Sequence, residues 1–396
     1  MGEIGFEAFD CDNHYYEATD AFTRHLDPAM AARCMQWADV DGRPRLLVGG
    51  QICRFVPHPR FEMVSKPGCL DQYFRGNASS DDIREAMGDL EPIRPEYRDR
   101  DARLELMDRQ GLEAAFLIPT LGVGMEEALA EDPEACVTAF WAFNRWLEED
   151  WGFAYRERIF ALPYLPLIDP DAAAEMVDWV VDHDARAIVL RAGPVALPEG
   201  GRASPGLPHF DPFWARVADA GITVAIHSGD SGYGRYVADW EPTASMEAYR
   251  QNAFRSMFMS DKPVFDTMAA LVCHGVFLRH PGLRVATIET GASYVPELLR
   301  KLGKYWSQNP GFFEHQDPRE TFRRHVWVSP YFEDDIPALV SQVGADHVLF
   351  GSDYPHPEGL ADPVSYVDEL DGLGEEAIRR IMRDNAFGLV TRDGSG

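Results

Sequence analysis

Short runs of apolar and β-branched residues recur along the chain and are separated by longer segments with helical spacing. This alternation is typical of parallel strands joined by crossover helices. The expected strands are residues 7–12, 113–119, 158–164, 187–192, 222–227, 283–289, 325–330 and 347–353. The expected helices include residues 99–110, 134–150, 170–183, 210–220, 293–304 and 374–387. The pattern predicts an α/β chain folded as a single (β/α)8 TIM barrel over residues 1–396, with a doubly wound open sheet as the competing topology.

The connection between the first two expected strands is far longer than one crossover helix requires. Within it, residues 34–55 alternate like two strands around the turn Asp41-Gly42, which indicates a β-hairpin. We therefore expect residues 20–97 to be inserted between strands one and two, over the barrel mouth. Two interpretations of its aromatic residues remain open, a substrate lid and a subdomain packed on the barrel. These residues are Trp37, Phe55, Phe61, Tyr73 and Phe74.

The charge of the chain limits its partners. Lys and Arg total 37 against 65 Asp and Glu, a formal net charge of −28 that repels nucleic-acid phosphates and anionic membrane surfaces. No run approaches the roughly 18 apolar residues of a membrane span, and the N-terminus lacks a signal-peptide pattern. The six cysteines include no C-x-x-C pair, so neither a zinc knuckle nor a disulfide framework is indicated. We expect a cytoplasmic protein that binds neither nucleic acid nor membrane.

Residues of the types that bind metals, His, Asp and Glu, lie at the carboxyl ends of several expected strands. Strand one ends with Asp12 and His14, whose side chains point the same way because side chains alternate along a strand. Strands five, six and eight end with His227, Glu289 and Asp353. In a TIM barrel these strand ends face one shared cavity, so the five side chains are expected to converge there.

Each of these residues also has an ordinary structural interpretation. His227 fits a hydrogen-bonded histidine of the core, and Asp12 or Asp353 fits a cap on the following helix. Their coincidence at one end of the barrel favours a metal, because several buried and unpaired charges would destabilise the fold without a compensating cation. A divalent metal and a small-molecule substrate are therefore expected at the barrel mouth.

Five motifs carry these residues: Asp12-x-His14-x-x-Glu17, Ile226-His227, Arg279-His-Pro-Gly-Leu-Arg-Val285, Glu289-Thr-Gly-Ala-Ser-Tyr-Val-Pro296 and Gly351-Ser-Asp-Tyr-Pro-His356. They resemble the motifs of the amidohydrolase-related TIM barrels, a family that includes aminocarboxymuconate-semialdehyde decarboxylase. The resemblance covers nearly the whole chain outside the insertion. It implies that Asp12, His14, His227 and Asp353 are metal ligands.

The chain departs from the pattern of that family at several positions. Glu289 stands where the catalytic histidine of strand six is expected, and His280, nine residues earlier, does not replace it. Arg191 ends strand four, where many two-metal hydrolases have a bridging Lys or Glu. His356 has two interpretations, a group that contacts the ligands or the substrate and a loop histidine held between two prolines. We treat Arg191, His280 and His356 as candidates for the layer behind the metal ligands.

A carboxylate in place of the strand-six histidine removes a general acid/base and adds a metal ligand. Six candidate ligands then exceed what one catalytic ion with an open position requires. They are Asp12, His14, Glu17, His227, Glu289 and Asp353, and His227, Glu289 and Asp353 are also the expected catalytic residues. This set resembles the TIM-barrel non-heme di-iron monooxygenases of the platensimycin-pathway diterpenoid hydroxylase type. That resemblance implies an oxidoreductase with two irons that hydroxylates a bulky apolar substrate with O2.

The alternative function is a hydrolase or a non-oxidative decarboxylase of the amidohydrolase superfamily, with zinc or manganese in place of iron. A catalytically inactive barrel used only for binding is disfavoured, because it leaves the ligand cluster unexplained. The residues do not decide whether the substrate is an acyl-CoA or whether the chain forms a homo-oligomer.

Overall fold

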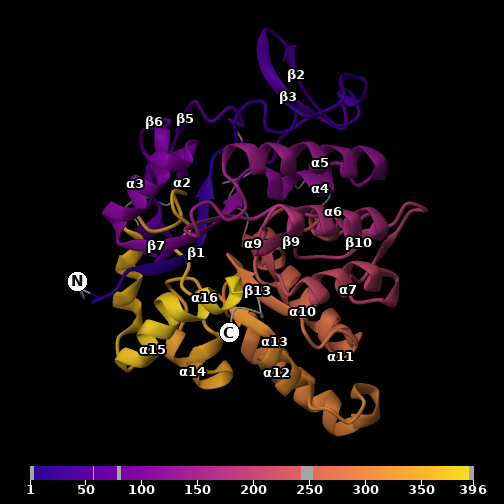
Figure 1. Cartoon of the computed structure of the whole chain (residues 1–396), viewed down its shortest axis with the longest axis vertical. Coiled ribbons are helices and arrows are strands. Elements are labelled where there is room, and N and C mark those ends of the chain that lie inside the picture. The colour runs from indigo at the N-terminus through magenta and orange to yellow at the C-terminus, as the bar shows by residue number, and fades with distance from the viewer. Residues whose placement is uncertain (1–3, 57, 78–81, 242–252, 392–396) are drawn as a thin grey trace.

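The computed structural model describes residues 4–56, 58–77, 82–241 and 253–391. Parallel strands from along the whole chain lie at the centre of the fold (Figure 1). They are β1 (Ala8–Tyr15), β7 (Leu112–Pro119), β8 (Ile159–Ala161), β9 (Ala187–Arg191), β12 (Thr223–His227), β13 (Arg284–Ile288) and β14 (Val326–Val328). These strands form two sheets, in the orders β1-β7-β8 and β9-β12-β13-β14.

Short backbone contacts join the two sheets into a closed barrel. A parallel bridge between Tyr164 and Val189 links the chain after β8 to β9. On the other side Val348 pairs with β14, and the carbonyl of Phe350 accepts a 2.9 Å hydrogen bond from the amide of Cys11 in β1. This segment therefore occupies the eighth strand position. The predicted TIM barrel is confirmed, and the open sheet is wrong.

Helices surround the barrel, and several begin at an aspartate whose carboxylate accepts a hydrogen bond from a backbone N–H of the first turn. These caps are Asp99, Asp132, Asp169 and Asp335. The longer helices are α3 (Arg100–Gln110), α5 (Pro133–Asp150), α6 (Pro170–Asp182), α7 (Asp211–Ala220), α10 (Lys262–Cys273), α12 (Tyr294–Gln308), α13 (Pro318–His325) and α14 (Ile336–Val343). The helix predicted at 374–387 is divided into α15 (Glu375–Arg379), a π-helical turn and α16 (Asn385–Val390).

The barrel strands are covered on both faces, which explains their sequence. Every residue of β1, β9 and β12 is buried. Strands buried on both faces read as nearly continuous apolar runs, so a polar side chain within one is an exception that needs a partner. The exceptions in β1 and β12 are Asp10, Asp12, Asn13, His14, Thr223 and His227.

The chain between β1 and α3 forms a series of small elements. β2 (Met35–Val40) and β3 (Arg43–Val48) are the predicted hairpin, and both turn residues, Asp41 and Gly42, have the positive φ that a tight two-residue turn requires. The others are β4 (Gln51–Ile52), β5 (Met63–Val64), α1 (Asp71–Phe74), α2 (Ile83–Met87) and β6 (Glu91–Pro92). The insertion boundaries, residues 20–97, stay a prediction, and residues 57 and 78–81 within them lie outside the described residues.

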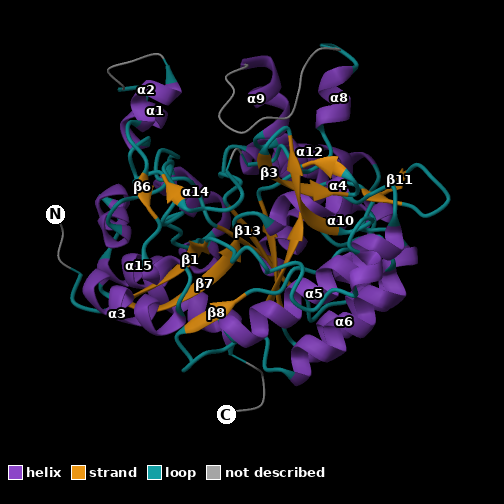
Figure 2. Ribbon diagram, turned by 90° about the horizontal axis from the view of Figure 1, so that it is seen from above, coloured by secondary structure: helices purple, strands orange, loops and turns teal. Residues whose placement is uncertain are grey.

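Further short elements are α4 (Met125–Ala128), β10 (Val195–Ala196), β11 (Arg202–Ala203), α8 (Gly234–Ala238), α9 (Ala253–Met259) and α11 (Val276–Arg279). In Figure 2, α1, α2, α8 and α9 lie on one side of the molecule, at the top of the view. Among the described residues, no helix combines the length and apolar character needed to cross a membrane.

Candidate metal centre

Five polar side chains meet at the carboxyl ends of the barrel strands. Asp12 and His14 lie in the second half of β1, His227 ends β12, and Glu289 directly follows β13. Asp353 follows the segment in the eighth strand position. The ligand atoms of two overlapping groups lie within 4.8 Å of one another. These groups are Asp12, His14, His227 and Glu289, and His14, Glu289, Asp353 and His356.

The two histidines of β1 and β12 direct Nε2 at the carboxylates. His14 Nε2 lies 3.2 Å from Asp12 Oδ1, 3.3 Å from Asp353 Oδ1 and 3.6 Å from Glu289 Oε2. His227 Nε2 lies 3.0 Å from Glu289 Oε2 and 3.4 Å from Asp12 Oδ1. Groups that bind one ion at about 2.0–2.2 Å lie at separations of this order. The geometry therefore fits a single ion among these side chains.

Backbone carbonyls orient both imidazole rings. His14 Nδ1 is 3.1 Å from the carbonyl oxygen of Ile118, and His227 Nδ1 is 2.7 Å from that of Ser228. A carbonyl only accepts, so each Nδ1 carries the proton and donates it, which leaves each Nε2 lone pair free for a metal. Metal-binding histidines are commonly held by such a partner.

Asp10 connects strand one to the eighth strand position behind the centre. Its Oδ1 accepts hydrogen bonds from the backbone amides of Asp12 and Ser352, and its Oδ2 accepts from the Asn13 side chain at 2.8 Å. Burial raises the pKa of the Asp10 carboxyl to about 6, although these donors oppose the rise. The amide of Asp353 also donates to the carbonyl of Asp12 at 2.7 Å, so the two candidate ligands are held in register.

Two of the candidate ligands have an unusual backbone. Glu289 and Asp353 have φ values of 51° and 55°, in the left-handed region that few non-glycine residues adopt. Such a conformation costs of order 1 kcal/mol or more per residue, and it is concentrated at functional sites. Here it turns each carboxylate at the end of its strand toward the histidines.

The charges of the centre require compensation. Burial disfavours the cationic form of His227, but Glu289 and Asp12 raise its pKa to about 9. Burial also opposes ionisation of Asp12, yet hydrogen bonds with His14 and His227 hold the pKa of Asp12 well below its usual range. A divalent cation would replace the histidine protons as the partner of these carboxylates. Two imidazoles and three carboxylates are thus a donor set that fits a divalent metal.

His356 lies beside the centre. Its Nδ1 is 2.6 Å from Asp353 Oδ1, its Nε2 is 3.0 Å from the hydroxyl of Thr120, and its ring centroid is 4.0 Å from that of His14. Burial lowers the pKa of His356 to about 4, and repulsion from His14 adds to this effect. His356 is therefore a neutral imidazole in contact with Asp353.

Glu17 belongs to neither group of candidate ligands. Its Oε1 accepts hydrogen bonds from the amides of Leu121 and Gly122 at 2.8 and 2.9 Å, so it holds the segment after β7. Its Oε2 is buried without a hydrogen-bond partner among the described residues. Burial raises the pKa of Glu17 to about 7. The structure therefore places Glu17 outside the centre, unlike the sequence-based expectation.

Replacing Glu17 by Gln is expected to stabilise the protein at alkaline pH. A carboxyl whose pKa rises from 4.5 to about 7 on folding destabilises the fold progressively as pH increases through this window, and fully above it. Between pH 5 and pH 8 the wild type should lose about 2 kcal/mol more unfolding free energy than Glu17→Gln. Denaturant unfolding at both pH values, with the exposed Glu62→Gln as control, measures this difference. Metal loss in Glu17→Gln would instead show that Glu17 is a metal ligand.

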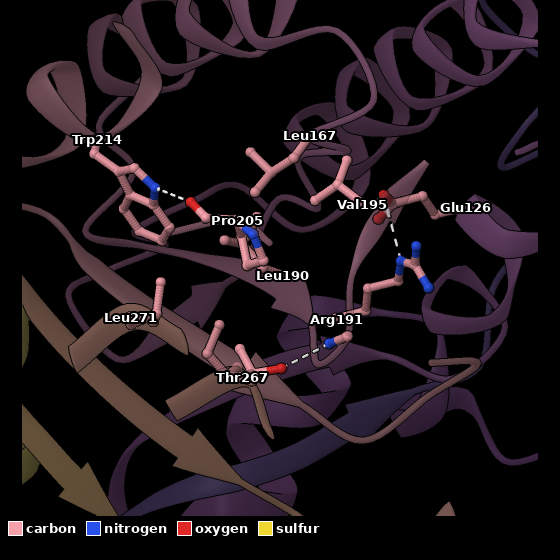
Figure 3. A pocket seen from close by; sticks show the side chains of 11 residues that line it. Glu126, Leu167, Leu190, Arg191, Val195, Pro205, Trp214, Thr267 and Leu271 are labelled. Carbon is pink, nitrogen blue, oxygen red and sulfur yellow. Dashed lines mark hydrogen bonds and ion pairs between the residues drawn. The ribbon is translucent and has the colours of Figure 1, made fainter. Parts of the chain in front are cut away.

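Arg191 and His280 also lie away from the centre. Arg191 ends β9, and its guanidinium lies 3.4 Å from Glu126 Oε1 and 3.2 Å from Glu127 Oε2, as the contact with Glu126 in Figure 3 illustrates. This buried ion cluster binds α4 to the barrel. His280 Nε2 lies 3.2 Å from Asp211 Oδ1 before β13 begins, which is the opposite end of the strand from Glu289.

Two neighbours of the centre escaped sequence reasoning. The hydroxyl of Tyr331 donates to the carbonyl of Glu289 at 3.0 Å. Burial and repulsion from Asp353 raise the pKa of Glu358 to about 7. Glu358 follows the His356 motif by two residues, so its position in that loop was the available signal. For Tyr331 the sequence offered no signal beyond its position after strand seven.

Two cavities meet at this centre. The larger has a volume of about 690 Å³ and is lined by His14, His227 and Glu289 among others. The smaller, of about 340 Å³, is lined by Asp353 and other acidic residues. Glu289 and Glu358 line both cavities. A small molecule in either cavity would contact the centre directly.

The family model for amidohydrolases matches residues 10–389, and the chain belongs to the amidohydrolase family. It is similar to the crystal structure of amidohydrolase map2389c from Mycobacterium avium subsp. paratuberculosis K-10, with 42% identity and a TM-score of 0.92 over 98% of this chain and 100% of that chain. It is 25% identical to a γ-resorcylate decarboxylase from Rhodococcus jostii (strain RHA1) over 306 residues, which are 74% of this chain and 88% of the relative. A dihydroxybenzoic acid decarboxylase from Polaromonas sp. JS666, solved with manganese and the inhibitor 2-nitroresorcinol, shares the fold at 17% identity and a TM-score of 0.57, over 81% of this chain and 93% of that chain.

These relatives correct the functional prediction made from the sequence. The prediction of an O2-dependent di-iron monooxygenase is wrong, because the matching curated relatives are γ-resorcylate decarboxylases. The associated terms iron, oxidoreductase and monooxygenase are wrong for the same reason. The broader predictions of a metalloenzyme on an amidohydrolase-related TIM barrel agree with the family and the fold. A divalent metal is supported by the centre's donor set.

Proposed function

We propose that the protein is a metal-dependent, non-oxidative decarboxylase of an aromatic carboxylic acid. The observation that carries this proposal is the convergence of Asp12, His14, His227, Glu289 and Asp353 at the barrel mouth, where a cavity reaches them. The relationship to γ-resorcylate decarboxylases supports the reaction class. The earlier alternative function thus becomes the main one.

One divalent ion is proposed, with Asp12, His14, His227, Glu289 and Asp353 as its ligands. The two groups of candidate ligands share His14 and Glu289, so two ions would compete for the same donors. Carboxylate and imidazole donors suit manganese, and a related decarboxylase structure contains that metal. When bound, the ion acts as a Lewis acid that orients and polarises the oxygens of the substrate.

Decarboxylation breaks the bond between the ring and the carboxyl carbon, releases CO2 and requires one proton at the ring carbon. We assign that proton to Asp353. The side chain of Asp353 lines the smaller cavity, and its Oδ1 lies 2.6 Å from His356 Nδ1, which places a carboxyl oxygen and a ring nitrogen together for proton transfer. Because His356 is a neutral imidazole, it would pass a proton to Asp353 from Nδ1 while Nε2, 3.0 Å from the Thr120 hydroxyl, takes up another. His227 and Glu289 are assigned to the metal and not to proton transfer.

The substrate is proposed to be a free small-molecule acid. A carboxylate must be available for release as CO2, and the acyl carbon of a CoA thioester does not offer one. The acyl-CoA substrate that the sequence left open is therefore not part of the proposal. The homo-oligomer, which the sequence also left open, is not part of it either.

Removal of the metal is expected to abolish CO2 release from 2,6-dihydroxybenzoate. Chelator-treated protein should regain activity with about one equivalent of Mn²⁺ per chain, because the proposed donor set holds one ion. Metal analysis together with CO2 detection measures both quantities. Activity that survives complete metal removal, or that returns only with two equivalents of iron, would contradict the proposal.

A further inference from the structure

The cavity of about 690 Å³ extends from the metal centre to residues of the chain between β1 and α3. Phe55 and Phe61 belong to its wall. Phe55 lies directly on Gly124, where a Cβ would be 2.3 Å from the Phe55 ring, so this wall is fixed against the segment after β7. Pockets that enclose drug-sized ligands have about 300–1,000 Å³. The cavity thus exceeds the needs of a single-ring acid.

The wall contributed by this chain segment is mainly apolar, with His58, Ser65 and Arg84 as its polar members. Its side chains include Phe55, Phe61, Met63, Val64, Met87 and Leu90. Phe61 and Val64 are buried, whereas Met63 and Leu90 are 43% and 38% exposed. The cavity therefore leads from the buried centre to the surface along apolar side chains. Covering exposed apolar surface of this kind with a ligand lowers the free energy of the complex.

The second cavity combines aromatic and acidic side chains. Phe74, Tyr331 and Phe332 line it, together with the carboxylates Asp12, Glu289, Glu333, Asp353 and Glu358. Its volume, about 340 Å³, is about half that of the larger cavity, and five carboxylates repel an anionic substrate. A long apolar part of the substrate therefore has more room in the larger cavity.

We propose that the substrate carries an apolar chain on the ring carbon opposite its carboxyl group, and that this chain lies against Met63, Met87 and Leu90. The inference rests on the proposed function, which places the carboxylate at the metal centre. A substituent opposite the carboxylate points away from that centre along the ring axis. His14, His227 and Glu289 line one part of the larger cavity and Met63, Met87 and Leu90 another, so a chain on that carbon has room to reach the apolar wall.

A homologous series of ligands tests this subsite. The acids are 2,6-dihydroxybenzoate and its 4-propyl, 4-pentyl and 4-heptyl derivatives, with CO2 release by the manganese-loaded enzyme as the readout. The binding probes are 2-nitroresorcinol and its 5-alkyl counterparts, with calorimetric Kd as a readout independent of turnover. Each methylene that becomes covered should increase kcat/KM and lower Kd by about two- to fourfold.

Variants locate the effect on the proposed wall. Met63→Asp and Leu90→Asp should reduce the gain per methylene, whereas Ile52→Asp, an exposed apolar position outside the cavity wall, should leave it unchanged. Equal Kd values across the series, or a full chain effect in Met63→Asp and Leu90→Asp, would overturn the subsite. A chain effect on binding with no CO2 from any acid would support the subsite and overturn the proposed reaction.

Discussion

Replacement of His14 by alanine is expected to remove the metal and to lower kcat/KM by about 10³-fold or more. His14 is 1% exposed, and its Nε2 faces Asp12, Glu289 and Asp353 within 3.6 Å. The substitution removes the imidazole nitrogen that lies among the three carboxylates, so the proposed ion loses a ligand. A catalytic metal supplies several kcal/mol of stabilisation to a transition state, and each 1.36 kcal/mol corresponds to tenfold in rate. Metal content and CO2 release are the two measurements.

The control for His14→Ala is His25→Ala. His25 lies at the surface, 2.9 Å from Glu149, and contacts neither cavity. The His25→Ala variant should keep metal and activity, because it removes an imidazole that lies away from the centre. Wild-type metal content in His14→Ala, with the fold confirmed by circular dichroism, would remove His14 from the centre.

Replacement of Glu289 by glutamine is expected to weaken metal binding by about 10–100-fold and to lower turnover by about 10²-fold. The amide keeps the size of the side chain and removes its charge. His227 Nε2 then loses a carboxylate at 3.0 Å, and the ion loses an anionic donor. The expected loss of affinity is based on metal sites in which removal of a group that only supports a ligand weakens metal binding by about 10–100-fold. Titration of Mn²⁺ by calorimetry gives the affinity.

Glu297→Gln provides the matched control for Glu289→Gln. Glu297 lies on α12, shortly after Glu289 in the chain, and pairs with Arg300 at the surface. It should retain wild-type affinity and turnover. Full occupancy and full turnover in Glu289→Gln would show that this carboxylate only packs beside the centre.

The barrel was predictable because both faces of its strands are covered. Near-continuous apolar runs separated by capped helices specify this arrangement, and the caps at Asp99, Asp132 and Asp169 mark the helix starts. The eighth strand was less regular than its sequence suggested. It pairs with β14 at Val348 and with β1 at Phe350, Asp353 and Tyr354, but these isolated contacts do not form a continuous strand.

The centre was predictable for a related reason, since each of its side chains ends an apolar strand. Glu17 was included because it follows the β1 pair in sequence, but β1 ends at Tyr15 and the alternation of side chains does not continue beyond it. The backbone amides after β7 bind Glu17 instead. Arg191 was considered from its strand position alone, whereas its charge is satisfied by Glu126 and Glu127.

The reaction could not be predicted from the same residues. The inference of two irons depended on six candidate ligands, and without Glu17 five remain in groups that share His14 and Glu289. A carboxylate-rich centre is compatible with several divalent metals, so donor type alone does not select oxygen chemistry. The proposed reaction class therefore rests on the relatives and not on the ligand count.

The most direct test of the account follows the carboxyl carbon and the new ring proton. The manganese-loaded enzyme would be given 2,6-dihydroxybenzoate labelled with 13C at the carboxyl group, in D2O, under argon and in air. We predict 13CO2 in equal amounts under both atmospheres and one deuterium at the ring carbon that carried the carboxyl group. Turnover that requires O2, or an oxygenated product that retains the label, would contradict non-oxidative decarboxylation.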